Sequence, residues 1–155
     1  MSGLPVCSLF LLLISAILNV ISLATAFWVT ARNFNLGLWR ICIGNICANL
    51  GSTAEIDSTR AFSIISFLLL LVAIVIQIRE IWFRAVSGAD KQKLTAILGF
   101  CAGASACIAM SVFTASARPS GGAMFSWSFA LGWVSTVLSM VAGAVAFVAI
   151  KTDAH

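Results

Sequence analysis

The sequence predicts an all-α transmembrane fold in which one domain, residues 1–155, crosses the bilayer with four helices. Three observations support this prediction: 61% of the residues are apolar, only 9% are charged, and the apolar residues gather in four long windows. A soluble globule of this size needs more polar surface than such a composition supplies. The short connections between the windows leave no room for a separate soluble domain.

Each window is long enough to cross the hydrocarbon core, which takes about 20 apolar residues in a helix. The predicted spans cover about residues 5–27, 61–78, 94–116 and 126–150. A cleaved signal peptide is an alternative for the first window, because Ala24, Thr25 and Ala26 resemble a cleavage site. That window is longer than an ordinary signal core and no Lys or Arg precedes it, which favours a retained span.

Charges and cysteines predict the orientation of the spans. The connection 79–93 and the C-terminal tail carry five Lys or Arg, against four in the connections 28–60 and 117–125, which is a weak preference. Cys42 and Cys47 add a stronger argument, because a disulfide between them needs an oxidising compartment. Two free thiols are the alternative. We expect extracellular loops at 28–60 and 117–125, a cytosolic loop at 79–93, and both termini in the cytosol.

The chemistry-bearing side chains predict no enzyme. The four windows hold no Asp, Glu, Lys, Arg or His, whereas transporters and intramembrane proteases place ionisable groups at membrane depth. The connections hold no paired carboxylates, no nucleophile with a base and no glycine-rich phosphate loop. We therefore expect no catalytic residue, no metal and no cofactor. The net charge of +4 comes from scattered basic residues, so no nucleic acid is expected either.

Small and polar residues recur at helical spacing inside the windows. Small side chains let two helix backbones approach closely, and a buried amide needs a hydrogen-bond partner on another helix. Such ridges either pack the bundle itself or form a contact between copies of the chain. The predicted packing residues are Asn19, Gly99, Gly103, Ser135, Ser139 and Gly143.

The first connection carries the most specific pattern. From Phe27 it reads FWVTARNFNLGLWRICIGNIC, and it ends in DSTRAF. This resembles the superfamily of peripheral myelin proteins, epithelial membrane proteins and claudins. Its members have a Trp after the first helix, then Gly-Leu-Trp with two cysteines, and an Arg before the second helix. Here the signature falls on Trp28, Gly37, Leu38, Trp39, Cys42, Cys47 and Arg60.

The resemblance implies a left-handed four-helix bundle topped by a small extracellular antiparallel sheet that the loops form. Trp28 and Trp39 would then hold the sheet against the membrane surface. Arg60 would satisfy loop carbonyls or pair with Glu55 or Asp57, with a solvated arginine at headgroup depth as the alternative. Independently, Trp28, Trp82 and Trp127 lie at the ends of spans, where indoles prefer the headgroup layer.

Two functions of different classes fit these expectations. The first is a plasma-membrane protein that organises cell contacts through its loops and lateral helix packing, with homo-oligomers or related four-span proteins as partners in cis or trans. The segments LWRICIGNIC and MFSWSFALGWV resemble lens fibre and killer-cell granule members of the superfamily, so a vesicle or granule protein regulating exocytosis is the alternative. An auxiliary channel subunit is a further one. Besides membrane lipid, the basic-aromatic loop 79–93 is a candidate site for a cytosolic regulator or an interfacial anchor.

Overall fold

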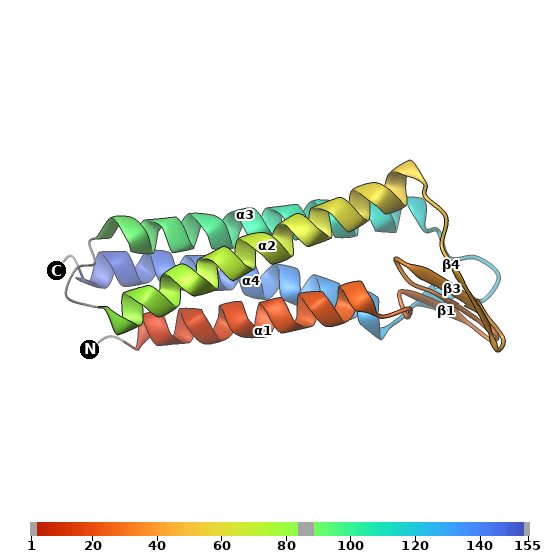
Figure 1. The fold of residues 1–155 in the computed structure, drawn as a ribbon, viewed down its shortest axis with the longest axis horizontal. Coiled ribbons are helices and arrows are strands. Elements are labelled where there is room, and N and C mark those ends of the chain that lie inside the picture. Colours follow the sequence, from red (N-terminus) through yellow and green to blue (C-terminus); the bar gives the residue numbers. More distant parts are fainter. Residues whose placement is uncertain (1–2, 84–88, 154–155) are drawn as a thin grey trace.

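The structure is a computed structural model that describes residues 3–83 and 89–153. Its helices run side by side along the long axis of the molecule, and a small sheet lies at one end of the bundle (Figure 1). Each of the four helices is long and apolar enough to cross a membrane, as predicted. They are α1 (Leu4–Ala24), α2 (Ala54–Trp82), α3 (Ala89–Ser116) and α4 (Trp127–Asp153).

The helix ends differ from the predicted span ends. α1 stops three residues before the end of its apolar window, and α2 begins at Ala54 rather than at residue 61. The reason is capping: Thr53 Oγ1 accepts a hydrogen bond from the Ile56 amide at 3.4 Å, and Glu55 and Asp57 favour the positive end of the helix dipole. Apolar windows mark residues that suit hydrocarbon, whereas caps decide where a helix begins.

At the other end of the bundle, too, the helices extend beyond the predicted spans. α2 continues to Trp82 and α3 begins at Ala89, so much of the predicted loop 79–93 is helical. Glu80 is buried inside α2, with the Lys91 ammonium 4.0 Å from its carboxylate. The apolar window 61–78 therefore underestimates how far the helix, and its buried face, extend.

Serines at intervals of seven residues join α1 to α4. Ser8 Oγ donates to the carbonyl of Ala142 at 3.1 Å, and Ser22 Oγ donates to the carbonyl of Ser128 at 2.7 Å. Between them, Ser15 and Ser135 each donate to the other's carbonyl, at 2.9 and 2.8 Å. An interval of seven residues returns to the same helix face after two turns, so one polar seam runs the length of the pair.

Glycines bring α3 and α4 into close contact. A Cβ placed on Gly99 would lie 3.0 Å from Gly143 Cα, and one placed on Gly143 would lie 3.0 Å from the carbonyl oxygen of Ala96. Gly103 faces Met140 and Ser139 of the same neighbour. Of the two possibilities that the sequence left open for these small residues, the structure has them packing the bundle itself.

The sheet is antiparallel throughout, with strand order β4-β3-β2-β1-β5. Four strands come from the connection between α1 and α2, and β5 comes from the connection between α3 and α4, so both loops build one sheet. This confirms the predicted antiparallel sheet. The strands are β1 (Val29–Ala31), β2 (Phe34–Leu36), β3 (Arg40–Ile43), β4 (Ile46–Asn49) and β5 (Met124–Phe125).

Candidate functional site

The sheet is fastened to the C-terminal end of α1 by two indoles. Trp28 Nε1 donates to the carbonyl of Ser22 at 2.7 Å, and Trp39 Nε1 donates to the carbonyl of Leu23 at 2.9 Å. The last four carbonyls of any helix lack partners within the helix. The two signature tryptophans therefore supply hydrogen-bond donors that the end of α1 requires, and they fix the sheet in place by doing so.

The Trp28 ring is a core residue. Its side chain is 1% exposed, and its ring centroid lies 4.6 Å from that of Phe113 on α3 and 6.0 Å from that of Phe129 on α4. The ring of Trp28 is therefore packed inside the protein and does not contact lipid headgroups, while its depth in the membrane stays a prediction. The ring fills the junction between the sheet and the helix ends, because an indole combines a large apolar surface with one donor that the end of α1 can use.

The Gly-Leu-Trp turn between β2 and β3 packs directly on the chain after α1. A Cβ on Gly37 would lie only 2.5 Å from Ala26 Cα, so any larger residue would push the turn off this surface. Leu38 is fully buried in the apolar cluster that also contains Trp28, Met110 and Phe113. The backbone amide of Gly37 closes the turn by donating to the carbonyl of Arg40 at 2.9 Å.

Arg60 fastens the sheet to α2. Its Nε donates to the carbonyl of Leu38 at 2.8 Å, its Nη2 donates to the carbonyl of Leu50 at 3.3 Å, and its Nη1 pairs with Asp57 at 2.8 Å. The guanidinium also lies over the Trp39 ring, 4.7 Å from its centroid. The side chain is largely buried and joins two loop carbonyls to α2, instead of being solvated.

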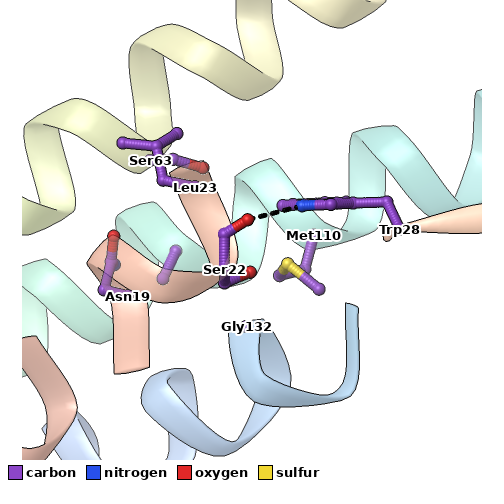
Figure 2. A pocket seen from close by; sticks show the side chains of 8 residues that line it. Asn19, Ser22, Leu23, Trp28, Ser63, Met110 and Gly132 are labelled. Carbon is purple, nitrogen blue, oxygen red and sulfur yellow. Dashed lines mark hydrogen bonds between the residues drawn. The ribbon is translucent and has the colours of Figure 1, made fainter. Parts of the chain in front are cut away.

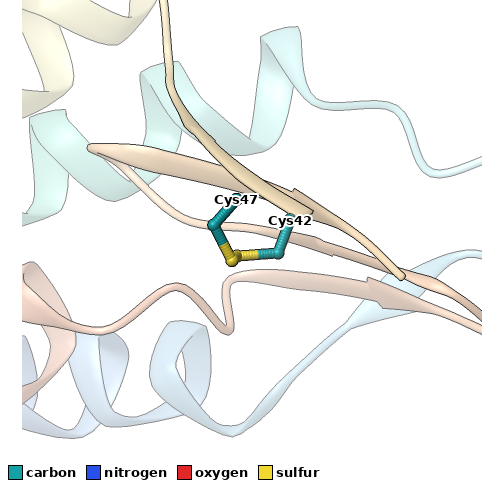
Figure 3. Close-up of a disulfide and its surroundings, with 2 residues drawn as sticks. All are labelled: Cys42 and Cys47. Atoms are coloured by element: carbon teal, nitrogen blue, oxygen red, sulfur yellow. A yellow bond between two sulfur atoms is a disulfide. The ribbon is translucent and has the colours of Figure 1, made fainter. Parts of the chain in front are cut away.

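A disulfide holds the β3–β4 hairpin together. Cys42 and Cys47 lie opposite each other in the two strands, with their Cα atoms 4.1 Å apart and their sulfurs bonded (Figure 3). The prediction of a loop disulfide is confirmed. Gly44 has φ +60°, a left-handed conformation that glycine adopts without strain at the first position of a two-residue hairpin turn. Its amide donates to the carbonyl of Asn33 at 2.8 Å, which joins the β3–β4 turn to the β1–β2 turn.

The end of this hairpin is apolar and exposed. Ile43 and Ile46 are paired across the strands and are 61% and 77% exposed, and every residue of the edge strand β4 is exposed. The β3–β4 turn lies at the end of the sheet that is away from the helix ends (Figure 1). We call Ile43, Gly44, Asn45 and Ile46 the distal turn. Ile43 and Ile46 thus form an exposed apolar pair at the far end of the disulfide-closed hairpin.

The predicted packing residues lie in several different interfaces. Ser135 bonds to α1, whereas Ser139 donates to the carbonyl of Thr136 within α4 at 2.9 Å. Asn19 on α1 donates to Ser66 Oγ on α2 at 3.4 Å, and Ser66 donates in turn to the carbonyl of Ala102 on α3 at 2.8 Å. Asn19 thus finds the interhelical partner that the sequence predicted.

Sequence reasoning missed the partners of the signature residues. Trp28, Trp39 and Arg60 donate hydrogen bonds to backbone carbonyls. Every residue has a backbone carbonyl, so the sequence does not show which ones accept. The α1–α4 seam was detectable, because Ser8 and Ser22 flank Ser15 at intervals of seven residues, as Ser128 and Ala142 flank Ser135.

The opposite end of the bundle presents aromatic and basic side chains. Trp82 is 81% exposed, Phe83 is exposed as well, and Arg79 and Lys93 are on the surface. This arrangement is typical of side chains that sit among lipid headgroups. The hypothesis of a regulator bound at 79–93 depends in part on Arg84, which lies outside the described residues.

Comparisons with known proteins agree with this geometry. A sequence profile of the PMP-22/EMP/MP20/Claudin family matches residues 2–146. Human lens fiber membrane intrinsic protein is 32% identical over 146 residues, covering 87% of this chain and 84% of the relative. Mouse claudin domain-containing protein 2 is 30% identical over 84% of this chain and 77% of its own length, and human protein NKG7 is 30% identical over 81% and 79%.

Proposed function

Because the chain belongs to the PMP-22/EMP/MP20/claudin family of non-enzymatic four-span membrane proteins, we propose that it organises contacts between membranes through the distal turn of its sheet. The observation that carries the proposal is the exposed Ile43–Ile46 pair on a hairpin that a disulfide closes. Exposing two isoleucines to water is unfavourable, by about 25 cal/mol for each Å² of apolar surface. Covering them against a partner recovers that free energy.

The mounting of the sheet supports the same function. Trp28 and Trp39 join it to α1, and Arg60 joins it to α2, so the hairpin has a fixed direction relative to the bundle. A rigid contact surface loses less conformational entropy on binding than a flexible loop does. The architecture therefore favours a contact protein in which the helices anchor the chain in the membrane and the sheet binds the partner.

The proposal requires a particular orientation in the membrane. The sheet faces the outside of the cell, where a disulfide persists, and both termini lie in the cytosol. The protein then resides in the plasma membrane, with copies of itself or related four-span proteins as partners. Human lens fiber membrane intrinsic protein, to which the chain is 32% identical, is by its name a protein of the lens fiber membrane.

A two-colour cell experiment tests this function. Cells that express the chain with a green tag at the C-terminus are mixed with cells that express it with a red tag, and the contacts are imaged. We expect both colours to concentrate where a green cell meets a red cell, and neither to concentrate where an expressing cell meets a non-expressing one.

Variants at the distal turn supply the control. Ile43→Asn with Ile46→Asn should leave delivery to the surface unchanged and abolish the enrichment. Met124→Gln is the control, because Met124 is 66% exposed on β5, at the opposite edge of the same sheet, and glutamine at this position creates no glycosylation sequon with Ser126. Retention of the wild-type chain in intracellular granules would contradict the proposal and favour a role in exocytosis instead.

A further inference from the structure

A small cavity lies under Trp28, where α1, α2, α3 and α4 meet below the sheet (Figure 2). Its volume is about 10 Å³. A cavity of roughly 10–15 Å³ holds one water molecule. The lining mixes polar side chains, Asn19, Ser22 and Ser63, with the apolar side chains of Leu23, Trp28 and Met110.

One polar atom in this cavity wall lacks a partner. Asn19 is 6% exposed, and while its Nδ2 donates to Ser66, its Oδ1 accepts no hydrogen bond from any residue that the structure describes. An unsatisfied buried acceptor costs about 1–3 kcal/mol. That cost disappears if a donor small enough for the cavity binds beside Asn19.

The rest of the wall suits a water molecule. Ser63, on α2, is buried and carries a hydroxyl, and Ser22 Oγ keeps lone pairs free after donating to the carbonyl of Ser128. A buried water normally makes two to four hydrogen bonds. On the far side, Gly132 leaves room for Met110, because a Cβ there would lie 2.7 Å from Met110 Sδ and 3.0 Å from Ser22 Oγ.

We propose that this cavity binds one long-lived water molecule, which donates to Asn19 Oδ1 and is hydrogen-bonded to the Ser63 hydroxyl. The water completes the polar contact between α1 and α2 directly below the point where Trp28 fastens the sheet. The two ligands of the water lie on different helices, so the water can bind both only if α1 and α2 keep their present spacing. It does not depend on the proposed function.

Nuclear magnetic resonance of the purified chain in detergent micelles tests the proposal. The chain has five asparagines, and the other four lie in the sheet or its turns, so selective ¹⁵N labelling of Asn isolates the Asn19 carboxamide. Magnetisation is transferred from water to this group by both NOE and ROE experiments. We expect transfer with opposite signs in the two experiments, the signature of a bound water, whereas the exposed Asn49 on β4 should show only brief surface hydration.

Two serine variants on α2 identify the second ligand. Ser63→Ala removes the hydroxyl without adding bulk and should abolish or greatly weaken the transfer to Asn19. Ser58→Ala is the matched control, because Ser58 donates to the carbonyl of Ala54 in its own helix, and it should keep the full signal. The proposal is overturned if wild-type Asn19 receives no magnetisation from water, or if Ser63→Ala leaves the transfer unchanged.

Discussion

Replacing Gly99 by alanine tests how closely α3 and α4 pack. The new Cβ would lie 3.0 Å from Gly143 Cα, 3.1 Å from Gly143 N and 3.2 Å from the Ser139 carbonyl oxygen, all closer than the 3.4 Å at which ordinary contact begins. These are backbone atoms that no side-chain rotation can move, so the two helices must separate. Overpacking of this kind costs about 1–3 kcal/mol, and the helix propensity of alanine returns about 1 kcal/mol.

Gly103→Ala is a second test on the same helix. Its Cβ would lie 2.5 Å from Met140 Cγ and 2.9 Å from Ser139 Oγ, so Met140 and the buried Ser139 must both shift. Neither atom is the flexible end of a long side chain, so this rearrangement also costs free energy. We expect Gly99→Ala and Gly103→Ala each to lower the free energy of unfolding by about 1 kcal/mol.

The assay is reversible unfolding of the purified chain in mixed micelles, followed by far-ultraviolet circular dichroism as denaturing detergent is added. A difference of 1.4 kcal/mol corresponds to a factor of ten in the unfolding equilibrium constant, so a loss of about 1 kcal/mol is measurable. A Gly99→Ala chain as stable as wild type would refute the packing argument.

Three further predictions concern the seam and the sheet. Arg60→Gln removes the cation that donates to the carbonyls of Leu38 and Leu50, which should destabilise the attachment of the sheet by about 2–3 kcal/mol. Amide hydrogen exchange should become faster in β3 and β4 while α1 keeps its protection, and unchanged exchange would show that Arg60 does not hold the sheet. Ser15→Ala removes one of two reciprocal bonds with Ser135 and should cost about 0.6–1.7 kcal/mol in the same unfolding assay, which a neutral result would contradict. Replacing both Cys42 and Cys47 with serine should cost the sheet about 2 kcal/mol yet leave membrane insertion of the helices intact; failure to insert, seen by alkaline extraction, would show that the bundle depends on the disulfide.

The bundle was predictable because lipid leaves few choices for a backbone. In hydrocarbon every backbone amide and carbonyl must be paired within the segment, so a long apolar window implies a helix. The ends were less predictable, since Thr53 and the acids after it start α2 in a stretch that no hydropathy window covers. The disulfide followed from two cysteines in a polar loop, and the sheet followed from the family signature.

The junction between sheet and bundle was less predictable, for a specific physical reason. Trp28 was assigned to the headgroup layer because an indole at a span end usually lies there. Its actual position depends on the carbonyl of Ser22 and on the rings of Phe113 and Phe129, which come from distant parts of the chain. The preference of tryptophan for one environment does not predict contacts between residues that are far apart in the sequence. The seven-residue spacing of serines in α1 and α4, by contrast, is visible in the sequence and indicates a polar contact between these helices.

The most direct test of a contact function is a tethering experiment with the purified chain alone. Two populations of liposomes, each carrying the chain with its sheet outward and each with a different fluorescent lipid, are mixed and followed by two-colour coincidence in single-particle imaging. We expect coincident particles for the wild-type chain and for Met124→Gln, and their loss for Ile43→Asn with Ile46→Asn. Wild-type liposomes that stay separate, or a double variant that tethers as well as wild type, would contradict the proposed contact function.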